Sequence, residues 1–307
     1  MTELAPQELR VLVAVAEAGG FSAAAHRLGI TQSAVSHSVR GSEAKVGAVL
    51  FDRGRAGASP TPAGERAVAL GRRILRLYEV LGAEARAAGR AAAGPGTAEG
   101  VLRIAAFRSA ALHLLPPALE RLAARHPGIR PEIRVVRELG PGTAGEVAAG
   151  RADLAIATLS GPASRPLPGP PSGLPDGLPD GLLSGELTRE AYSLVHPAGH
   201  PDPKGLPLLD WDENCGSYTR DWWRAQDWIP RATVKAEDDA MVLTMVGRGL
   251  GMAILPELSL REATDAVEIA GLGPQGPVRR VGYVTTPELA STLAVRALIR
   301  ELRAERG

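Results

Sequence analysis

A row of polar residues within positions 21–40 carries side chains that suit nucleic acid. The row follows the spacing of one helical face and comprises Gln32, Ser33, Ser36, His37 and Arg40. Glutamine and arginine form hydrogen bonds to base edges in a major groove, whereas serine and histidine suit phosphates or bases. The row therefore predicts a helix that lies in the major groove of double-stranded DNA.

The residues around this row favour a helix-turn-helix. Ala25 is small enough for two helices to cross closely, and Gly29 permits the tight turn between them, because a positive φ is costly for other residues. Thr31 is placed to cap the second helix. The predicted apolar contacts of that helix are Leu28, Ile30, Val35 and Val39. The alternative is a generic helical hairpin whose exposed face happens to be polar.

The length and composition exclude several classes of protein. The 307 residues suffice for about two to three domains, and 45% hydrophobic with 22% charged residues is ordinary globular material. No apolar run of about 18 residues and no signal-peptide pattern occurs, so neither membrane insertion nor secretion is expected. The single cysteine, Cys215, excludes a disulfide framework and a zinc site built on several cysteines. We therefore expect a cytoplasmic protein.

Charge is divided unevenly along the chain. Residues 1–90 hold 12 Lys and Arg against 8 Asp and Glu, whereas the remainder holds 23 against 26. The net charge of +1 thus combines a basic head with a mildly acidic body. A polyanionic partner is expected to meet the first ninety residues.

The motifs of common enzymes do not fit this sequence. Gly247, Gly249 and Gly251 lie between a predicted helix and a predicted strand, the reverse of the order that a dinucleotide site needs. Neither a P-loop nor a Gly-x-Ser-x-Gly motif occurs. His196 and His200 are separated by a proline and a glycine, so they cannot share a helical face as metal ligands would. We expect no catalysis, no metal site and no cofactor.

Residues 63–92 contain no proline and predict one long helix. Its apolar residues are spaced by 3, 4, 3 and 4 positions and are Ala67, Leu70, Ile74, Leu77 and Leu81. Such an a/d seam commonly pairs with a second helix. The alternative is that the helix packs on its own domain. Residues 93–97, rich in Gly and Pro, predict a linker.

Beyond the linker, short apolar strands alternate with helices, which is typical of a parallel α/β sheet. The predicted strands are 101–106, 132–136, 153–158, 192–195, 251–255 and 278–284. The predicted helices are 119–126, 143–149, 218–226, 240–248 and 289–305. Residues 160–185, rich in Pro, Gly, Leu and Asp, predict a surface insertion without a core of its own.

Taken together, the motifs resemble those of the LysR-type transcriptional regulators. In the head they are residues 21–40, Leu50-Phe51-Asp52-Arg53 and Thr61-Pro62-Ala63-Gly64-Glu65. In the body they are Gly150-Arg-Ala-Asp153-Leu-Ala-Ile, Gly199-His200-Pro201 and Val246-Gly-Arg-Gly249-Leu-Gly251-Met-Ala-Ile-Leu-Pro256. The resemblance covers nearly the whole chain, and the combination is specific although no single piece is.

The resemblance implies a multidomain α/β protein in three parts. These are a winged helix-turn-helix over 1–62, a linker and dimerisation helix over 63–93, and a two-lobed, periplasmic-binding-protein-like effector domain over 94–307. Lobe I would comprise about 98–160 and 260–307, and lobe II about 186–259. The resemblance further implies a homodimer or homotetramer, with promoter DNA and RNA polymerase as partners.

Carried over residue by residue, the resemblance implies two sites. The DNA-binding residues would be Thr31, Gln32, Ser33, Ser36, His37 and Arg40 in the major groove, with Arg53 and Arg55 on the wing. A small anionic effector would bind between the lobes, in contact with Arg108, Ser109, Cys215, Gly216, Ser217 and Tyr218.

Some residues of the body have alternative interpretations. Ser109 is equally suited to cap a helix, and Asp238 and Asp239 are expected to be N-caps rather than ligands. A cluster of three tryptophans suits a stacking platform for an aromatic effector or a subunit or lobe interface, and we favour the interface. The cluster consists of Trp222, Trp223 and Trp228.

Two alternative functions remain within the same fold. One is a redox sensor acting through Cys215, although family members that sense peroxide generally use a pair of cysteines. The other is a repressor that binds DNA without an effector.

The sequence departs from the family pattern at Ser42, where a leucine is usual before acidic residues. Loss of this apolar anchor is expected to loosen the contact between the recognition helix and the wing. The insertion at 160–185 is also longer than the family pattern.

Overall fold

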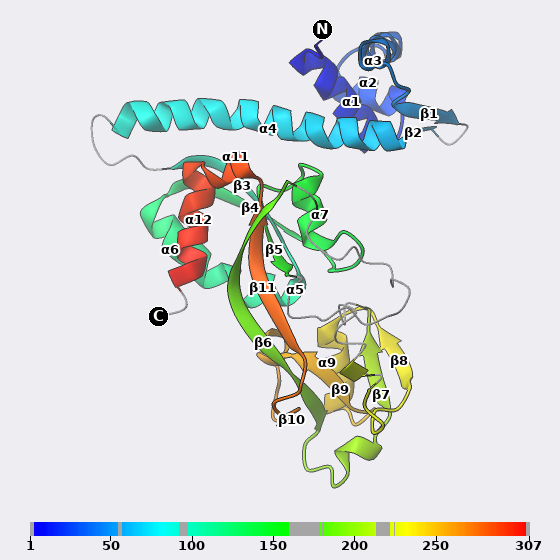
Figure 1. Cartoon of the computed structure of the whole chain (residues 1–307), viewed down its shortest axis with the longest axis vertical. Helices are drawn as coiled ribbons and strands as arrows, with labels where there is room; N and C mark the ends of the chain where they lie inside the picture. Colours follow the sequence, from blue (N-terminus) through cyan, green and yellow to red (C-terminus); the bar gives the residue numbers. More distant parts are fainter. Residues whose placement is uncertain are drawn as a thin grey trace.

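The structure is a computed structural model that describes residues 3–54, 57–91, 98–159, 179, 181–212, 222–223 and 225–304. A small helical head is followed by one long helix and a two-lobed α/β body (Figure 1). Several predicted features lie outside the described residues: Arg55, the linker at 93–97, most of the insertion, most of the predicted helix 218–226, and Cys215, Gly216, Ser217 and Tyr218.

The head consists of three helices and a two-stranded antiparallel wing. Its elements are α1 (Pro6–Ala18), α2 (Phe21–Leu28), α3 (Gln32–Val46), β1 (Phe51–Gly54) and β2 (Gly57–Pro60). Val35 and Val39 are buried in the core that α3 shares with α1 and α2, as predicted, whereas Ile30 is exposed. Gly29 adopts a φ of 65° in the turn before α3, which confirms the turn predicted there.

The helix α3 continues beyond Arg40, the last residue of the polar row. It runs to Val46 and ends at Gly47, which adopts a left-handed φ of 74°. The side chain of Ser42 is fully buried and its hydroxyl donates to the backbone oxygen of Ser38. Ser42 therefore occupies a core position, which is filled by a small side chain.

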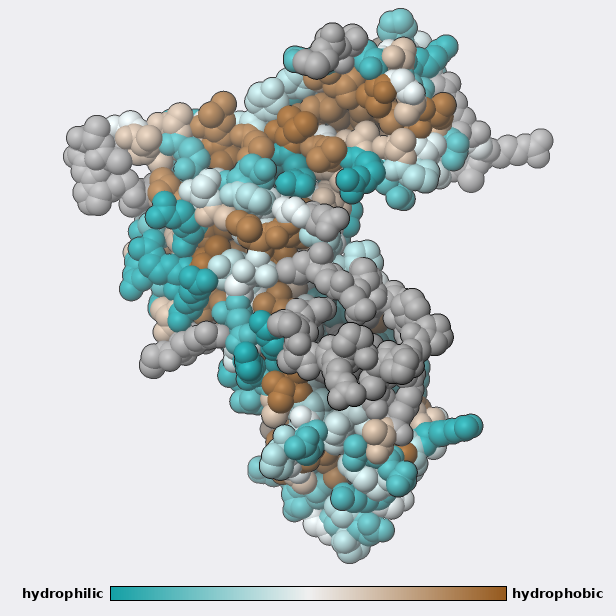
Figure 2. Space-filling view, viewed as in Figure 1, coloured by the Kyte–Doolittle hydropathy of each residue, from teal (hydrophilic) through white to brown (hydrophobic). Residues whose placement is uncertain are grey.

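The long helix α4 (Pro62–Ala91) has two different faces. One face packs on α1, where Gly71 lies against Leu9 and Val13. The other face carries most of the predicted seam, and its apolar side chains are 36–64% exposed: Leu70, Ile74, Leu77, Tyr78 and Leu81. Figure 2 shows apolar side chains along this helix. The two alternatives for the helix thus describe its two faces: one packs on its own chain, and the other has no partner among the described residues.

The sheet of the body is mixed rather than parallel, and in this respect the sequence prediction was wrong. Its strand order is β10-β6-β11-β5-β3-β4, with β9 paired to β6. Only the pairs β3·β4 and β3·β5 are parallel within it. Alternation of strands and helices is the same for both arrangements, because periodicity does not record strand direction.

Lobe I comprises the parallel strands and the helices that cover them. Its elements are β3 (Glu99–Ala106), α5 (Arg108–His113), α6 (Leu115–Arg125), β4 (Gly128–Val135), α7 (Gly142–Ala148), β5 (Leu154–Thr158), α11 (Pro287–Ala290) and α12 (Leu293–Arg303). The predicted helix 289–305 is thus two helices, because Thr286 and Thr292 each occupy an N-cap position and begin a separate helix.

Two long strands, β6 (Leu183–Pro197) and β11 (Val278–Thr285), pair with each other and connect the lobes (Figure 1). Lobe II contains a 3₁₀ turn (Pro203–Gly205), β7 (Leu208–Trp211), β8 (Ala232–Ala236), α9 (Asp239–Gly247), β9 (Ala253–Pro256), α10 (Glu257–Leu260) and β10 (Val267–Gly271). β6 begins within the predicted insertion, because Leu183 to Gly185 pair with the end of β11. β10 pairs with the end of β6, so it lies in lobe II although the sequence assigned it to lobe I.

Candidate DNA-binding surface and effector site

The N-terminus of α3 is held by hydroxyl groups of its own segment. The hydroxyl of Thr31 accepts a hydrogen bond from the backbone N–H of Ala34 at 3.2 Å, which confirms the predicted N-cap. It also shares a hydrogen bond with the hydroxyl of Ser33 at 2.9 Å. These contacts fix the exposed end of the helix without using Gln32.

Gln32, His37 and Arg40 project from the exposed side of α3. Gln32 and His37 form no side-chain hydrogen bond within the described part of the chain. Ser36 differs, because it is only 7% exposed and its hydroxyl accepts from Arg40 Nη2 at 3.0 Å. The prediction that Ser36 faces outward was therefore wrong. Arg40 lies one helical turn after Ser36, and its side chain covers the serine.

The wing is attached to α3 by a carboxylate. Glu43 Oε1 accepts the backbone N–H groups of Leu50 at 2.8 Å and Phe51 at 3.3 Å, at the start of β1. This polar contact joins the recognition helix to the wing next to the small side chain of Ser42. The backbone of Arg53 lies in β1, opposite Ala58 of β2.

A buried ion pair joins α4 to lobe I. Asp153 immediately precedes β5, its side chain is 2% exposed, and both of its oxygens accept from Arg76 at 2.7 Å. The guanidinium of Arg76 also donates to the backbone oxygen of Val101 and to Glu79. Burial lowers the pKa of Arg76, but the hydrogen bonds and charge of Asp153 and Glu79 outweigh it, and the net pKa is raised. The aspartate of the Gly150–Asp153 motif therefore holds the long helix.

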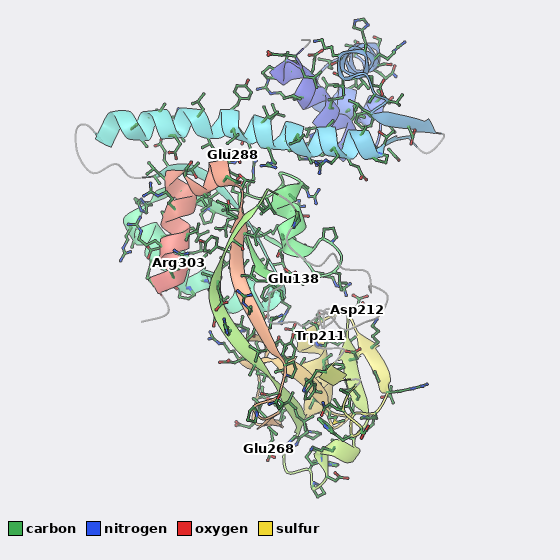
Figure 3. The ribbon with its side chains drawn as sticks, viewed as in Figure 1. Glu138, Trp211, Asp212, Glu268, Glu288 and Arg303 are labelled. Carbon is green, nitrogen blue, oxygen red and sulfur yellow. The ribbon has the colours of Figure 1, made fainter. Side chains whose placement is uncertain are left out.

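Further polar contacts follow the same face of α4. Arg73 pairs with Glu288 at 3.4 Å, Arg86 pairs with Glu99 at 3.0 Å, and the carboxylate of Glu84 accepts the backbone N–H of Leu293 at the start of α12. Figure 3 shows Glu288 next to the long helix. The backbone of lobe I approaches so closely that a Cβ on Gly150 would lie 2.8 Å from that of Arg72. Glycine is required there because its φ is also 69°.

Arg108 connects the two lobes. It begins α5 in lobe I and donates to Asp239 of α9 at 3.0 Å and to Glu262, after α10, at 2.7 Å. Asp239 is 2% exposed and also accepts from the hydroxyl of Ser259. The cation that the sequence offered to an anionic effector is therefore paired with two carboxylates.

A second contact between the lobes joins the segments that follow β4 and β7. Arg137, which follows β4, pairs with Asp212, which follows β7, at 2.9 Å. Lys235 pairs with the same carboxylate at 2.8 Å, and hydrogen bonds from Lys235 and Arg137 lower the pKa of Asp212. Figure 3 shows Glu138 and Asp212 on the facing ends of the two lobes.

The strands that connect the lobes contain a further buried pair. Arg279 of β11 and Glu190 of β6 are 1% and 2% exposed and are 2.7 Å apart. The guanidinium of Arg279 lies 4.6 Å from the ring centre of Phe107. Phe107 is the residue that precedes Arg108 in the chain. Glu190 also accepts the backbone N–H of Leu258 in α10. This buried pair therefore contacts the N-cap of α5 on one side and the backbone of α10 on the other.

The remaining predicted residues of the body have mixed outcomes. Ser109 is buried in the first turn of α5, whose N-cap is Phe107, so the interpretation of Ser109 as a cap was wrong. Asp238 caps α9 through the N–H of Met241, as predicted, whereas Asp239 pairs with Arg108.

The three clustered tryptophans pack against the core of lobe II rather than forming a separate platform. Their neighbours there are Tyr192, Leu194, Met252 and Ile254.

Sequence reasoning missed the carboxylates that neutralise the body's arginines. Asp239 was interpreted as a cap, and Glu262 and Glu190 were not predicted to pair with any arginine. Arg279, the partner of Glu190, was not predicted as a site residue either. No local motif marks them, because their partners are 68 to 154 positions away. A possible signal was the presence of charged residues in or beside apolar strands, where an unpaired charge is costly.

None of the helices in the described part of the chain is long and apolar enough to cross a membrane. No group of three or more His, Cys, Asp or Glu among the described residues is arranged to hold a metal ion.

A winged helix-turn-helix followed by a long helix and a two-lobed domain defines a class of DNA-binding regulator, and comparison with known proteins identifies the family. Residues 6–65 match the bacterial regulatory helix-turn-helix protein of the lysR family, and residues 95–307 match the LysR substrate binding domain. The chain belongs to the LysR family of transcriptional regulators, with a DNA-binding head and an effector-binding domain.

Similar proteins support this assignment over the full length. The probable HTH-type transcriptional regulator LrrA of Synechococcus elongatus is 33% identical, over 94% of this chain and 92% of that protein. Two solved structures share the fold. Full-length CbnR complexed with its target DNA has a TM-score of 0.60 at 20% identity, covering 98% of this chain and 99% of that one. Full-length LysG from Corynebacterium glutamicum, with bound effector Arg, has a TM-score of 0.63 at 21% identity, with the same two coverages.

Proposed function

We propose that α3 recognises a specific promoter sequence and that Gln32, His37 and Arg40 contact the DNA. The observation that carries the proposal is their exposure on one side of α3. The hydroxyls of Thr31 and Ser33 are bonded to each other at the start of the same helix. Arg53 and Arg55 of the wing would contact the backbone or the minor groove. CbnR, whose fold is similar, has been solved with its target DNA.

Two copies of the chain would pair through the exposed seam of α4, forming a homodimer or, through a second interface, a homotetramer. The apolar side chains from Leu70 to Leu81 support this pairing, because such a stripe on a long helix is stable only when covered. Pairing would place two basic heads over one operator. RNA polymerase would be a further partner at the promoter.

The effector would be a small anion bound between the lobes. Arg108 supports this proposal through its position at the junction and its side chain, which is 30% exposed. Asp239 and Glu262 accept from two of the five N–H donors of the guanidinium, and we propose that an anion replaces one of these carboxylates. Binding would then weaken a contact between the lobes, which is a direct route from ligand to conformation.

The DNA-binding proposal is tested with a duplex selected from random sequences by the wild-type protein. Gln32→Ala should weaken binding to the selected duplex about tenfold or more and leave binding to a scrambled duplex unchanged. The matched control is Gln7→Ala, an exposed glutamine of α1. Equal losses on both duplexes would exclude Gln32 as a reader of base sequence.

The effector proposal is tested by measuring thermal stability in the presence of small carboxylates, amines and neutral compounds. Carboxylates should stabilise the wild type, and Arg108→Ala should abolish that shift. Arg86→Ala, which removes an exposed arginine of α4 away from the junction between the lobes, should retain it. Stabilisation by amines or neutral compounds alone would contradict an anionic effector.

A further inference from the structure

Ser36 lies between two exposed polar residues of α3 but is itself covered. Gln32 lies one turn before it and Arg40 one turn after it. The residue is 7% exposed, whereas both neighbours belong to the exposed surface. Its hydroxyl is therefore not freely presented to a partner that approaches the helix.

The cover is the side chain of Arg40. Arg40 Nη2 donates to the hydroxyl of Ser36 at 3.0 Å, and Arg40 Nε donates to the backbone oxygen of the same residue at 3.3 Å. A guanidinium carries five N–H donors in a planar fork, so these two bonds leave three. Two bonds to one residue fix both the direction and the plane of the group. The long side chain is folded back toward the N-terminal half of α3, where Gln32 lies.

We propose that Ser36 is a positioning residue, which acts on DNA recognition through Arg40 rather than by contacting DNA itself. The inference rests on the proposed role of α3 in reading DNA. An arginine held in one orientation loses less conformational freedom when its remaining donors meet a phosphate or a guanine edge. Without the hydroxyl, Arg40 would retain its charge but would have to be ordered on binding.

A double-mutant cycle on the selected duplex tests the proposal. Ser36→Ala should weaken specific binding about threefold to tenfold in the wild type, which is the range expected for one hydrogen bond. In an Arg40→Ala background the same substitution should change binding less than twofold, because the group that it positions is absent. Ser36→Thr keeps the hydroxyl and should restore binding. Ser38→Ala is the matched control, a serine of the same helix whose hydroxyl has no partner within the described residues.

Three outcomes separate this proposal from its rivals. If Ser36→Ala weakens binding equally with and without Arg40, the hydroxyl contacts DNA directly and the proposal is wrong. If Ser36→Ala lowers the thermal midpoint of the protein and Ser36→Thr does not restore binding, the role is structural and the proposal is again overturned. A wild-type protein that selects no duplex would instead remove the proposed function on which the inference rests.

The salt dependence tests separately whether Arg40 itself contacts a phosphate. Ser36→Ala should leave the slope of log affinity against log salt unchanged if Arg40 still reaches DNA, whereas Arg40→Ala should reduce that slope by about 1 if it contacts a phosphate. If Ser36→Ala reduced the salt slope while Arg40→Ala left it unchanged, the result would contradict an action of Ser36 through Arg40.

Discussion

Two arginines join the parts of this molecule, and their surroundings differ. Arg76 connects α4 to lobe I, has a side chain that is 10% exposed, and uses both oxygens of a buried aspartate. Arg108 connects lobe I to lobe II, is 30% exposed, and divides its donors between a buried and a half-exposed carboxylate. At the first junction the backbones approach closely at Gly150, whereas the arginine of the second junction is partly open to solvent.

The difference separates a rigid junction from an adjustable one. Breaking a buried, fully bonded pair leaves an uncompensated charge away from water. A pair that borders solvent can exchange partners, because water or a ligand can replace a carboxylate. Lobe I and α4 are therefore expected to move as one body, while lobe II moves relative to them.

The largest expected effect is at the rigid junction. Arg76→Ala should lower the free energy of unfolding by about 3–5 kcal/mol, because Asp153 is left buried without a cation. Urea unfolding followed by circular dichroism measures the change. Arg86→Ala, which removes an exposed pair from the same helix, should cost less than about 1 kcal/mol. If both variants lost the same free energy of unfolding, the buried pair at Arg76 would be no more stabilising than the exposed pair at Arg86.

The adjustable junction should respond less strongly to the same kind of change. Arg108→Ala should lower the free energy of unfolding by about 1–3 kcal/mol, because Asp239 keeps its hydrogen bond from Ser259. It should also increase hydrogen exchange in α5 and α10 while leaving α4 unchanged. Faster exchange in α4 as well would mean that the two junctions are coupled rather than independent.

The smallest expected effect is a dependence on pH at the adjustable junction. Burial lowers the pKa of His113 in α5, while the charge of Glu262 opposes this shift. The neutral imidazole therefore stabilises the fold above the ordinary pKa of about 6.5, and this stabilisation is lost as the pH falls through that value and below it. His113→Met should reduce the loss of stability between pH 7 and pH 5, measured by urea unfolding. His26→Gln in the head is the control, and an identical reduction there would exclude a specific role for His113.

The head was the more predictable half of the molecule. Its helix-turn-helix depends on contacts close in sequence, such as the cap at Thr31 and the turn at Gly29, and each leaves a local signal. Ile30, which is exposed, and Ser36 are exceptions. A helical face does not reveal which polar side chain another will cover. The body was less predictable, because a strand pattern does not record its direction or its neighbours.

The sequence by itself determined the order of the parts, the helix-turn-helix, the long helix with its seam, and the family. These follow from periodicity, turn residues and short motifs, which act over one or two turns of chain. The tertiary structure alone decided which charges meet. Arg108 and Asp239 are 131 positions apart, and Arg76 and Asp153 are 77 apart. Such pairs form because burial makes an unpaired charge costly, and only the folded chain determines which opposite charge lies within reach.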